Sequence, residues 1–386
     1  MDNSQPVLII AGTVRERLAD FPVGTNEMKQ LMKRLTALCL ALLMSVSVFA
    51  VTAAAEGRRS WRATVPCSRT FRHVTVIGDS IPSGYGLNGL VPFYPYTLEN
   101  YMRMSGPFVV PGSYPDLVGK AVGAKWVYKL AREAYTTINI LRILDPSYEE
   151  AMNEPRHYYD RFVLDLMGLA ASTEYPMDQP FIRVTATRAV KHSDAIIINL
   201  ANNDTFSLAL GEPFFKPMYY AGGMTAMAAL SALEGKLQTI GSLEEWVEAA
   251  GGIHTFERSL WRNELQYEEN FDRLIKRIRE LNPKAEIYVV GMYNLFGQNK
   301  PEWGLLRNWT ARLNVRLIRK LKRFYTKKSA YRNEIHYVSV VDTDVWNTWP
   351  MYSPFYYMNF LVQIHPTPEG HLYMANQILN SMNQNG

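Results

Sequence analysis

The stretch His73-Val74-Thr75-Val76-Ile77-Gly78-Asp79-Ser80-Ile81-Pro82-Ser83-Gly84 places a short apolar run directly before a serine. The branched apolar residues over 73–77 predict a buried β-strand, and the glycines and proline that follow predict a tight turn. Ser80 therefore lies at the end of a strand. A serine hydroxyl is a poor nucleophile by itself and needs a neighbouring general base.

A candidate for that base lies near the other end of the chain. The segment Ile364-His365-Pro366-Thr367-Pro368-Glu369-Gly370-His371 holds two histidines at the start of a predicted helix over 367–382. Separation in sequence does not prevent contact in the fold. His365 is the candidate base and His371 is the second candidate, while a purely structural role for His365 is the alternative. A serine and a distant histidine predict nucleophilic catalysis on an ester.

Short runs of branched and aromatic residues alternate with helical patterns along the rest of the chain, which predicts a parallel sheet with helices on both faces. The predicted strands are 73–78, 125–131, 195–200, 286–291 and 335–341. The predicted helices are 115–122, 181–191, 260–281 and 367–382, and the cations between Arg307 and Lys328 belong to one more amphipathic helix. We expect a three-layer α/β/α fold, a flavodoxin-like arrangement with a five-stranded parallel sheet.

Two stretches are too long to be loops in a domain of this kind. They are 145–180 and 206–259, and we expect helical insertions over the carboxyl edge of the sheet. The second contains the small-residue segment 221–230, which is either a lid or a packing helix. Residues 56–386 are predicted to form a single hydrolase domain.

The beginning of the chain has the pattern of a secretory signal. Basic residues just after Met28 precede an apolar stretch over 35–51, and Ala53-Ala54-Ala55 supplies small residues before a cut. We predict a signal peptide over 28–55, a secreted or cell-surface protein, and no stable membrane span after cleavage. A transmembrane anchor is the alternative. Residues 1–27 fit no part of this signal and are interpreted as an upstream extension.

Composition narrows the range of partners. The 386 residues are 47% hydrophobic and 20% charged, which suits one large globular domain. The net charge is +5, but the cations are scattered, so no nucleic-acid partner is predicted. Of the two cysteines, Cys39 lies in the leader, so Cys67 alone would remain and no internal disulfide forms. No metal-ligand spacing occurs, and no cofactor is implied.

The motif Gly78-Asp79-Ser80-Ile81 resembles block I of the SGNH (GDSL-type) hydrolases, whose nucleophilic serine lies near the mature amino terminus. The Gly-x-Ser-x-Gly motif of α/β hydrolases fits badly, because Pro82 stands two residues after the serine. Asn199-Leu200-Ala201-Asn202-Asn203-Asp204 is similar to block III of the family, and 364–371 is similar to block V.

This resemblance implies roles for individual residues. Ser80 would attack an acyl carbonyl and His365 would act as its base. The side-chain amide of Asn203 and the backbone N–H groups of Ser80 and Ala134 would hold the oxyanion. Ala134 stands where block II has a glycine, and Ala201 stands where block III has one. Helix capping is the alternative role for Asn203.

One position departs from the family pattern. The family places an aspartate three residues before the histidine, and here that residue is Val362. Asp342 and Asp344, at the end of the fifth predicted strand, are candidates for orienting His365, and a backbone carbonyl is the third. Because this aspartate is missing, a catalytically degenerate glycan-binding or surface protein on the same fold is an alternative to an active enzyme.

The resemblance implies an esterase that acts on a small-molecule or polysaccharide ester. Members of the family remove acetyl groups from polysaccharides or cleave lipid and thioester acyl chains. The chain holds 23 Tyr and 8 Trp, which suits stacking on sugar rings, although aromatic stretches such as 346–357 also serve packing. We therefore expect short-chain acyl groups on carbohydrate as the substrate, with a lipase or lysophospholipase-like activity as the alternative.

Overall fold

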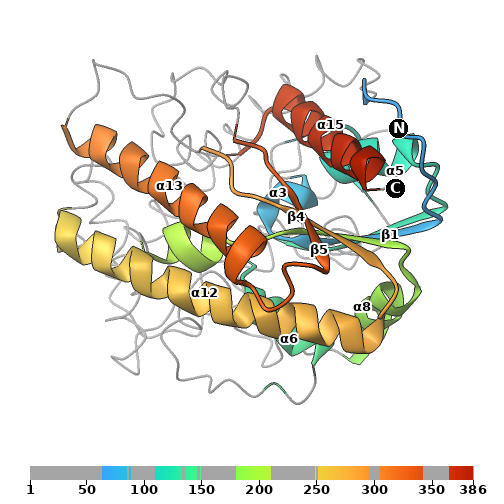
Figure 1. Ribbon diagram of the computed structural model, residues 1–386, viewed down its shortest axis with the longest axis horizontal. Helices are drawn as coiled ribbons and strands as arrows, with labels where there is room; N and C mark the ends of the chain where they lie inside the picture. The colour runs from blue at the N-terminus through green and yellow to red at the C-terminus, as the bar shows by residue number, and fades with distance from the viewer. Residues whose placement is uncertain are drawn as a thin grey trace, which may run out of the picture. The chain divides into compact units, whose positions relative to one another are not determined.

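A five-stranded parallel sheet with the order β2-β1-β3-β4-β5 lies between helices in the computed structural model (Figure 1). The structure describes residues 63–84, 87, 109–132, 135–145, 148, 180–209, 248, 251–294, 305–341 and 365–385, all within the unit Gly57–Gly386. This strand order is the flavodoxin-like one. The predicted three-layer fold is confirmed.

Each strand begins within one residue of its predicted start. The strands are β1 (His73–Gly78), β2 (Trp126–Ala131), β3 (Ala195–Asn199), β4 (Glu286–Val290) and β5 (Ile335–Val338). The central strands β1 and β3 are buried almost throughout, as continuous apolar runs require when helices cover both faces. β5 ends earlier than predicted because its ladder with β4 stops at the pair Val290 and Val338.

Helices bury one apolar cluster on each face of the sheet. One face is covered by α6 (Thr137–Leu144), α8 (Pro180–His192), α12 (Ile253–Leu281) and α13 (Leu305–Arg323), and the other by α5 (Tyr114–Ala121) and α15 (Pro368–Gln384). Short helical turns follow β1, β3 and α13: α3 (Ser80–Ser83), η3 (Asn203–Ser207) and η4 (Phe324–Lys328). The predicted helices are all present, α12 begins at Ile253 rather than Leu260, and α6 was not predicted.

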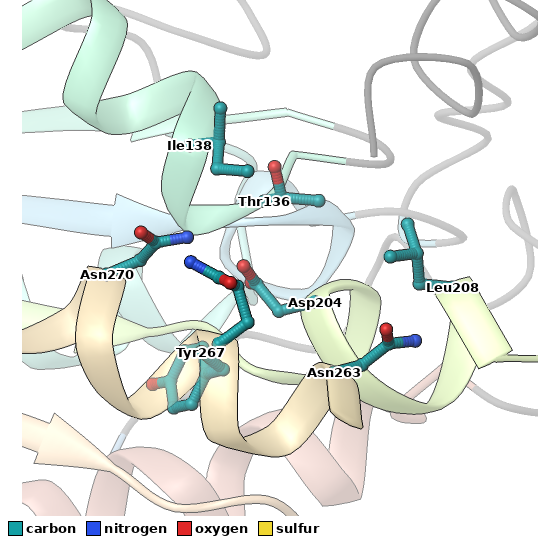
Figure 2. Close-up of a pocket in the computed structure, with 8 residues that line it drawn as sticks. Thr136, Ile138, Asp204, Leu208, Asn263, Tyr267 and Asn270 are labelled. Atoms are coloured by element: carbon teal, nitrogen blue, oxygen red, sulfur yellow. The ribbon is translucent and has the colours of Figure 1, made fainter. Parts of the chain in front are cut away.

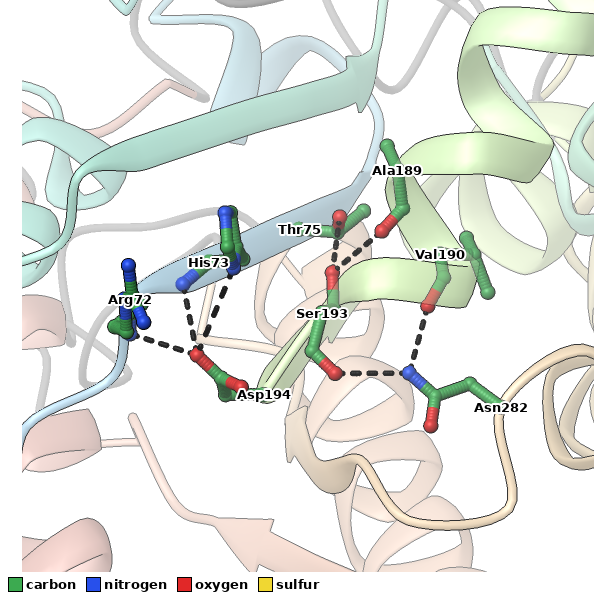
Figure 3. A network of polar contacts seen from close by, with 8 residues as sticks. All are labelled: Arg72, His73, Thr75, Ala189, Val190, Ser193, Asp194 and Asn282. Carbon is green, nitrogen blue, oxygen red and sulfur yellow. Dashed lines mark hydrogen bonds and ion pairs between the residues drawn. The ribbon is translucent and has the colours of Figure 1, made fainter.

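A polar network joins the amino ends of β1 and β3 (Figure 3). Asp194 Oδ2 accepts the backbone N–H groups of Arg72 at 2.7 Å and His73 at 2.9 Å. Asn282 Nδ2 donates to the carbonyl of Ser193 at 2.8 Å, beyond the end of α8. The Asp194 bonds link the starts of β1 and β3, and the parallel pairing of these strands places their carboxyl ends, Gly78 and Asn199, side by side.

The segment before β1 is bonded to α15, the last helix of the chain. Asn376 Oδ1 accepts the backbone N–H groups of Thr64 at 3.0 Å and Val65 at 3.1 Å. Asn383 Nδ2 donates to the carbonyl of Pro66 at 2.9 Å. The beginning and end of the described chain therefore lie together.

Several predicted features lie outside the described residues. They are the extension 1–27, the leader 28–55 with Cys39, the segment 221–230, and most of the insertions 145–180 and 206–259. Among the helices that the structure does describe, none combines the length and apolar character needed to cross a membrane.

Candidate active site

Ser80 opens the short helix α3 immediately after β1. Asp79 caps this helix, because its Oδ1 accepts the backbone N–H of Ile81 at 3.0 Å. Gly78 has no room for a side chain, since a Cβ there would lie 2.5 Å from the carbonyl oxygen of Asn199. The chain thus passes close to β3 and turns sharply, which places Ser80 at the carboxyl edge of the sheet.

His365 meets Ser80 from the other end of the chain. Its Nε2 lies 2.7 Å from Ser80 Oγ, although 285 positions separate the two residues. His365 is buried and precedes α15, whose first turn is capped by Thr367 through a bond of 3.1 Å from the N–H of Gly370. The serine and the histidine that the sequence singled out are therefore within hydrogen-bonding distance.

The end of β3 is bonded to the segment that follows β2. Asn203 Nδ2 donates to the carbonyl of Tyr135 at 3.1 Å. The carboxylate of Asp204 accepts the backbone N–H of Thr137, with its two oxygens at 2.9 Å and 3.1 Å. The start of η3 has no side-chain cap hydrogen bond at Asn202, and the bond made by Asn203 is a donated one, unlike that of a helix cap.

Ala201 adopts a backbone conformation that favours glycine. Its φ is +98°, and it is the only non-glycine residue in the described ranges with a positive φ. The turn is fixed because the carbonyl of Ala201 accepts from both the N–H of Thr205, at 3.0 Å, and its Oγ1, at 2.6 Å. Such a conformation costs an L-residue about 1–2 kcal/mol. Glycine, which has no Cβ, would adopt the backbone conformation of position 201 without this cost.

Four positions named in the sequence analysis lie outside the described residues: Ala134, Asp342, Asp344 and Val362. Ala134 directly precedes Tyr135, whose carbonyl accepts from Asn203. The roles assigned to these four positions stay predictions.

Asp79 is a fully buried carboxyl group beside the nucleophile. Burial raises its pKa to about 7, and the charge of Asp204 adds to this, while the hydrogen bond from Ile81 opposes it. A substantial fraction of Asp79 is therefore protonated at neutral pH.

His371 occupies a different place from His365. Its Nδ1 accepts the backbone N–H of Tyr114 at 3.3 Å, and the two rings stack with centroids 6.1 Å apart. Burial, with smaller contributions from the charges of His365 and Lys129, lowers the pKa of His371 to about 3. His371 is neutral at physiological pH, and of the two candidate bases it is His365 that contacts Ser80.

A small cavity lies beside Asp204 (Figure 2). Its lining comes from the start of α6, from both ends of η3 and from α12: Thr136, Ile138, Asp204, Leu208, Asn263, Gln266, Tyr267 and Asn270. Within the described residues, Asn263 Nδ2 and Asn270 Oδ1 are buried without a hydrogen-bond partner. Amide groups of this kind suit water or hydroxyl groups as partners.

Lys129 was not predicted as a site residue. This residue lies in the middle of β2, is fully buried, and donates from Nζ to the carbonyl of Ser83 at 3.0 Å. The sequence signal that could have identified it is a lysine within the otherwise apolar strand Trp126–Ala131.

Several solved structures resemble this chain at low sequence identity. An extracellular lipase from Streptomyces rimosus is 14% identical, with a TM-score of 0.43, over 80% of this chain and 98% of the lipase chain. Phospholipase A1 from Streptomyces albidoflavus is 14% identical, with a TM-score of 0.40, over 82% of this chain and 100% of that one.

An acetyl xylan esterase from Butyrivibrio proteoclasticus is 18% identical, with a TM-score of 0.37, over 83% of this chain and 65% of that chain. No protein-family model matches the sequence, and no curated protein matches it.

Proposed function

We propose that this chain is a serine esterase of the SGNH (GDSL-type) hydrolase family that hydrolyses acyl esters. The observation that carries the proposal is the distance of 2.7 Å between Ser80 Oγ and His365 Nε2. A serine at a strand end needs such a neighbour to become a nucleophile. The resemblance of its motif, and the order Ser80, Asn203, His365, agree with this assignment.

In the proposed reaction, Ser80 Oγ forms a bond to the acyl carbon while its proton passes to His365 Nε2. The tetrahedral intermediate collapses when the bond to the alcohol breaks, and His365 returns the proton to the departing alcohol oxygen. Water then attacks the acyl-enzyme, with His365 again taking the proton. Collapse of the second intermediate releases the carboxylic acid and restores the Ser80 hydroxyl.

The negative charge of the intermediates requires fixed donors. We assign this role to the N–H of Ser80, the N–H of Ala134 and the side-chain amide of Asn203. An amide nitrogen carries two hydrogens, so Asn203 has a second donor besides the one given to Tyr135. The bond to Tyr135 supports the assignment, because it holds the Asn203 amide against the residue that follows Ala134 in the chain.

The group that orients His365 is either the carboxylate of Asp342, that of Asp344, or a backbone carbonyl. A chain whose histidine is poorly oriented would be the degenerate glycan-binding or surface protein described above. The short Ser80–His365 contact favours the enzyme over that alternative.

For the substrate, we propose a short acyl group, most simply acetyl, on a carbohydrate. The 23 Tyr and 8 Trp residues of the chain support this choice, because aromatic side chains can stack on sugar rings. A lipid acyl ester is the second candidate. The predicted leader over 28–55 would carry the enzyme out of the cell.

The experiment that tests the activity uses a fluorophosphonate, which reacts with activated serines. Wild-type protein should be labelled at Ser80, as peptide mass analysis can show. Ser80→Ala should abolish labelling, and His365→Ala should slow it by orders of magnitude because the hydroxyl loses its proton acceptor. His254→Ala, at an exposed position on α12, serves as the control and should label like wild type.

A folded wild-type protein that resists labelling and cleaves no short-chain ester would leave the binding protein as the better interpretation. A panel of carbohydrate acetates and of simple esters with rising acyl length separates the two substrate classes. Turnover that rises with acyl length would contradict the short-acyl proposal.

A further inference from the structure

The strand β2 carries a buried lysine on the face covered by α5 and α15. Side chains alternate along a strand, so Lys129 shares a face with Val127, which lies directly against Gly119 of α5. The ladder partner of Lys129 on β1 is Val76, which belongs to the apolar cluster on that same face. The surroundings of Lys129 are thus those in which a strand normally carries an apolar residue.

A cation in such a place is costly. The effective penalty for removing an ammonium group from water is several kcal/mol, and well-packed apolar residues often replace buried charges with no loss of stability. Packing alone therefore does not explain a lysine at position 129. Its hydrogen bond gives a more specific reason.

Lys129 Nζ donates to the carbonyl of Ser83 at 3.0 Å. Ser83 is the last residue of α3, and its own Oγ donates to the carbonyl of Ser80 at 2.7 Å. The helix α3 spans only four residues, which is far too short to be stable through its own backbone bonds. Contacts from outside must hold the turn that carries the nucleophile, and Lys129 supplies one from the neighbouring strand.

We propose that Lys129 is a positioning residue, which fixes the turn Ser80–Ser83 so that Ser80 Oγ stays within reach of His365. This inference rests on the proposed esterase activity of Ser80. It assigns Lys129 no contact with the substrate, because its effect passes through Ser83.

The test compares Lys129→Met with wild type in the full chain. Methionine keeps an unbranched side chain of similar length but removes the donor and the charge. We expect kcat for a short-chain ester, and the rate of fluorophosphonate labelling, to fall at least about tenfold, since small misplacements of a nucleophile are costly. KM should stay within about twofold and the denaturant midpoint should be unchanged or higher.

Two further variants separate positioning from general stability. Lys129→Arg keeps a charged donor and should recover a substantial part of the lost kcat. Thr75→Val removes a different buried hydrogen bond of the same sheet, the one to Ser193 at 2.6 Å, and should leave kcat unchanged. If Lys129→Met does not fold, Lys129→Leu, which also lacks a donor and a charge, replaces it with the same expectations.

Wild-type kcat in a folded Lys129→Met protein overturns the positioning role while leaving the esterase intact. A loss of kcat that follows a loss of stability in both the Met and Arg variants also overturns it, because the role would then be structural. A wild-type protein that is neither labelled nor active overturns the esterase proposal and this inference together.

Discussion

The side-chain amide of Asn203 donates to the backbone carbonyl of Tyr135 at 3.1 Å, which links the end of β3 to the segment after β2. Asp204, the next residue, accepts the N–H of Thr137 at 2.9 Å. Consecutive side chains thus hold the first residues of α6 against η3. An amide restrained in this way would lose little entropy on binding an oxyanion through its second N–H, as we propose for Asn203.

The first prediction concerns this amide. Asn203→Ala should keep the fold and lower kcat by about 10²–10³-fold, which is typical for loss of one oxyanion donor. Steady-state kinetics on a short-chain ester, with circular dichroism as the check on folding, provide the measurement. Unchanged turnover in a folded variant would show that Asn203 has only a structural role, through its hydrogen bond to Tyr135.

The second prediction identifies the group that orients His365. If a carboxylate does so, only one of Asp342→Asn and Asp344→Asn should slow fluorophosphonate labelling strongly, because the imidazole then loses its fixed tautomer. If a backbone carbonyl does so, neither variant should slow it. Equal and strong slowing by both would contradict both arrangements.

The third prediction uses the strained backbone at Ala201, whose φ is +98°. Ala201→Gly should raise the free energy of unfolding by up to about 1 kcal/mol, because relief of strain exceeds the extra entropy of glycine in the unfolded chain. Urea unfolding of the two proteins measures the difference. A glycine variant less stable than wild type would show that the conformation carries little strain.

The fourth prediction follows from Asp79, whose pKa burial raises to about 7 from an ordinary value of 3.8. Between these values the native state holds the proton more tightly than the unfolded state, so the stability contribution of Asp79 falls as pH rises through that window. Asp79→Asn removes this dependence. The variant should therefore gain stability relative to wild type by a few kcal/mol between about pH 4 and about pH 8.

Denaturant unfolding of both proteins across that range gives the measurement. Burial, as the largest cause, also raises the pKa of Glu268 to about 7. Because both the variant and the wild type contain Glu268, its contribution to the pH dependence cancels in the comparison. A constant difference between variant and wild type at all pH values would show that Asp79 has an ordinary pKa.

The fifth prediction concerns processing. If 28–55 is a cleaved leader, protein recovered from the medium of a secreting host should begin near Glu56. Intact-mass analysis decides this, and secreted material that retains residues 28–55 would contradict the predicted cut.

Strand positions were predictable because five apolar runs are bounded by turn residues, and four of the five starts agree with the structure to the residue. The start of α12 was predicted too late because its N-cap is Gly252, with no side-chain cap bond to mark it. The helix α6 was missed. Its start is fixed by a bond of 2.7 Å from the N–H of Thr136 to Asn139, a local pattern without the acidic residue common in capping boxes.

At the site, the pairing of Ser80 with His365 was predictable, because each lies in a motif with its own context. The role of Lys129 was not predictable, because it depends on the carbonyl of Ser83, which lies in the turn after β1 and not in β2. The place of His371 was likewise set by Tyr114, which is far away in sequence. Such contacts depend on which helix covers which face of the sheet, and local sequence patterns do not determine this.

The hydrogen bonds between the segment 64–66 and α15 have a consequence for the protein during its synthesis. Ser80 is translated 285 positions before His365, and α15 follows His365. A nascent chain therefore carries Ser80 without its proposed base until His365 has been added and α15 can bond to the segment 64–66. The hydrolase we propose would be inactive until then, and premature termination between Ser80 and His365 would yield a protein with the serine but without catalysis.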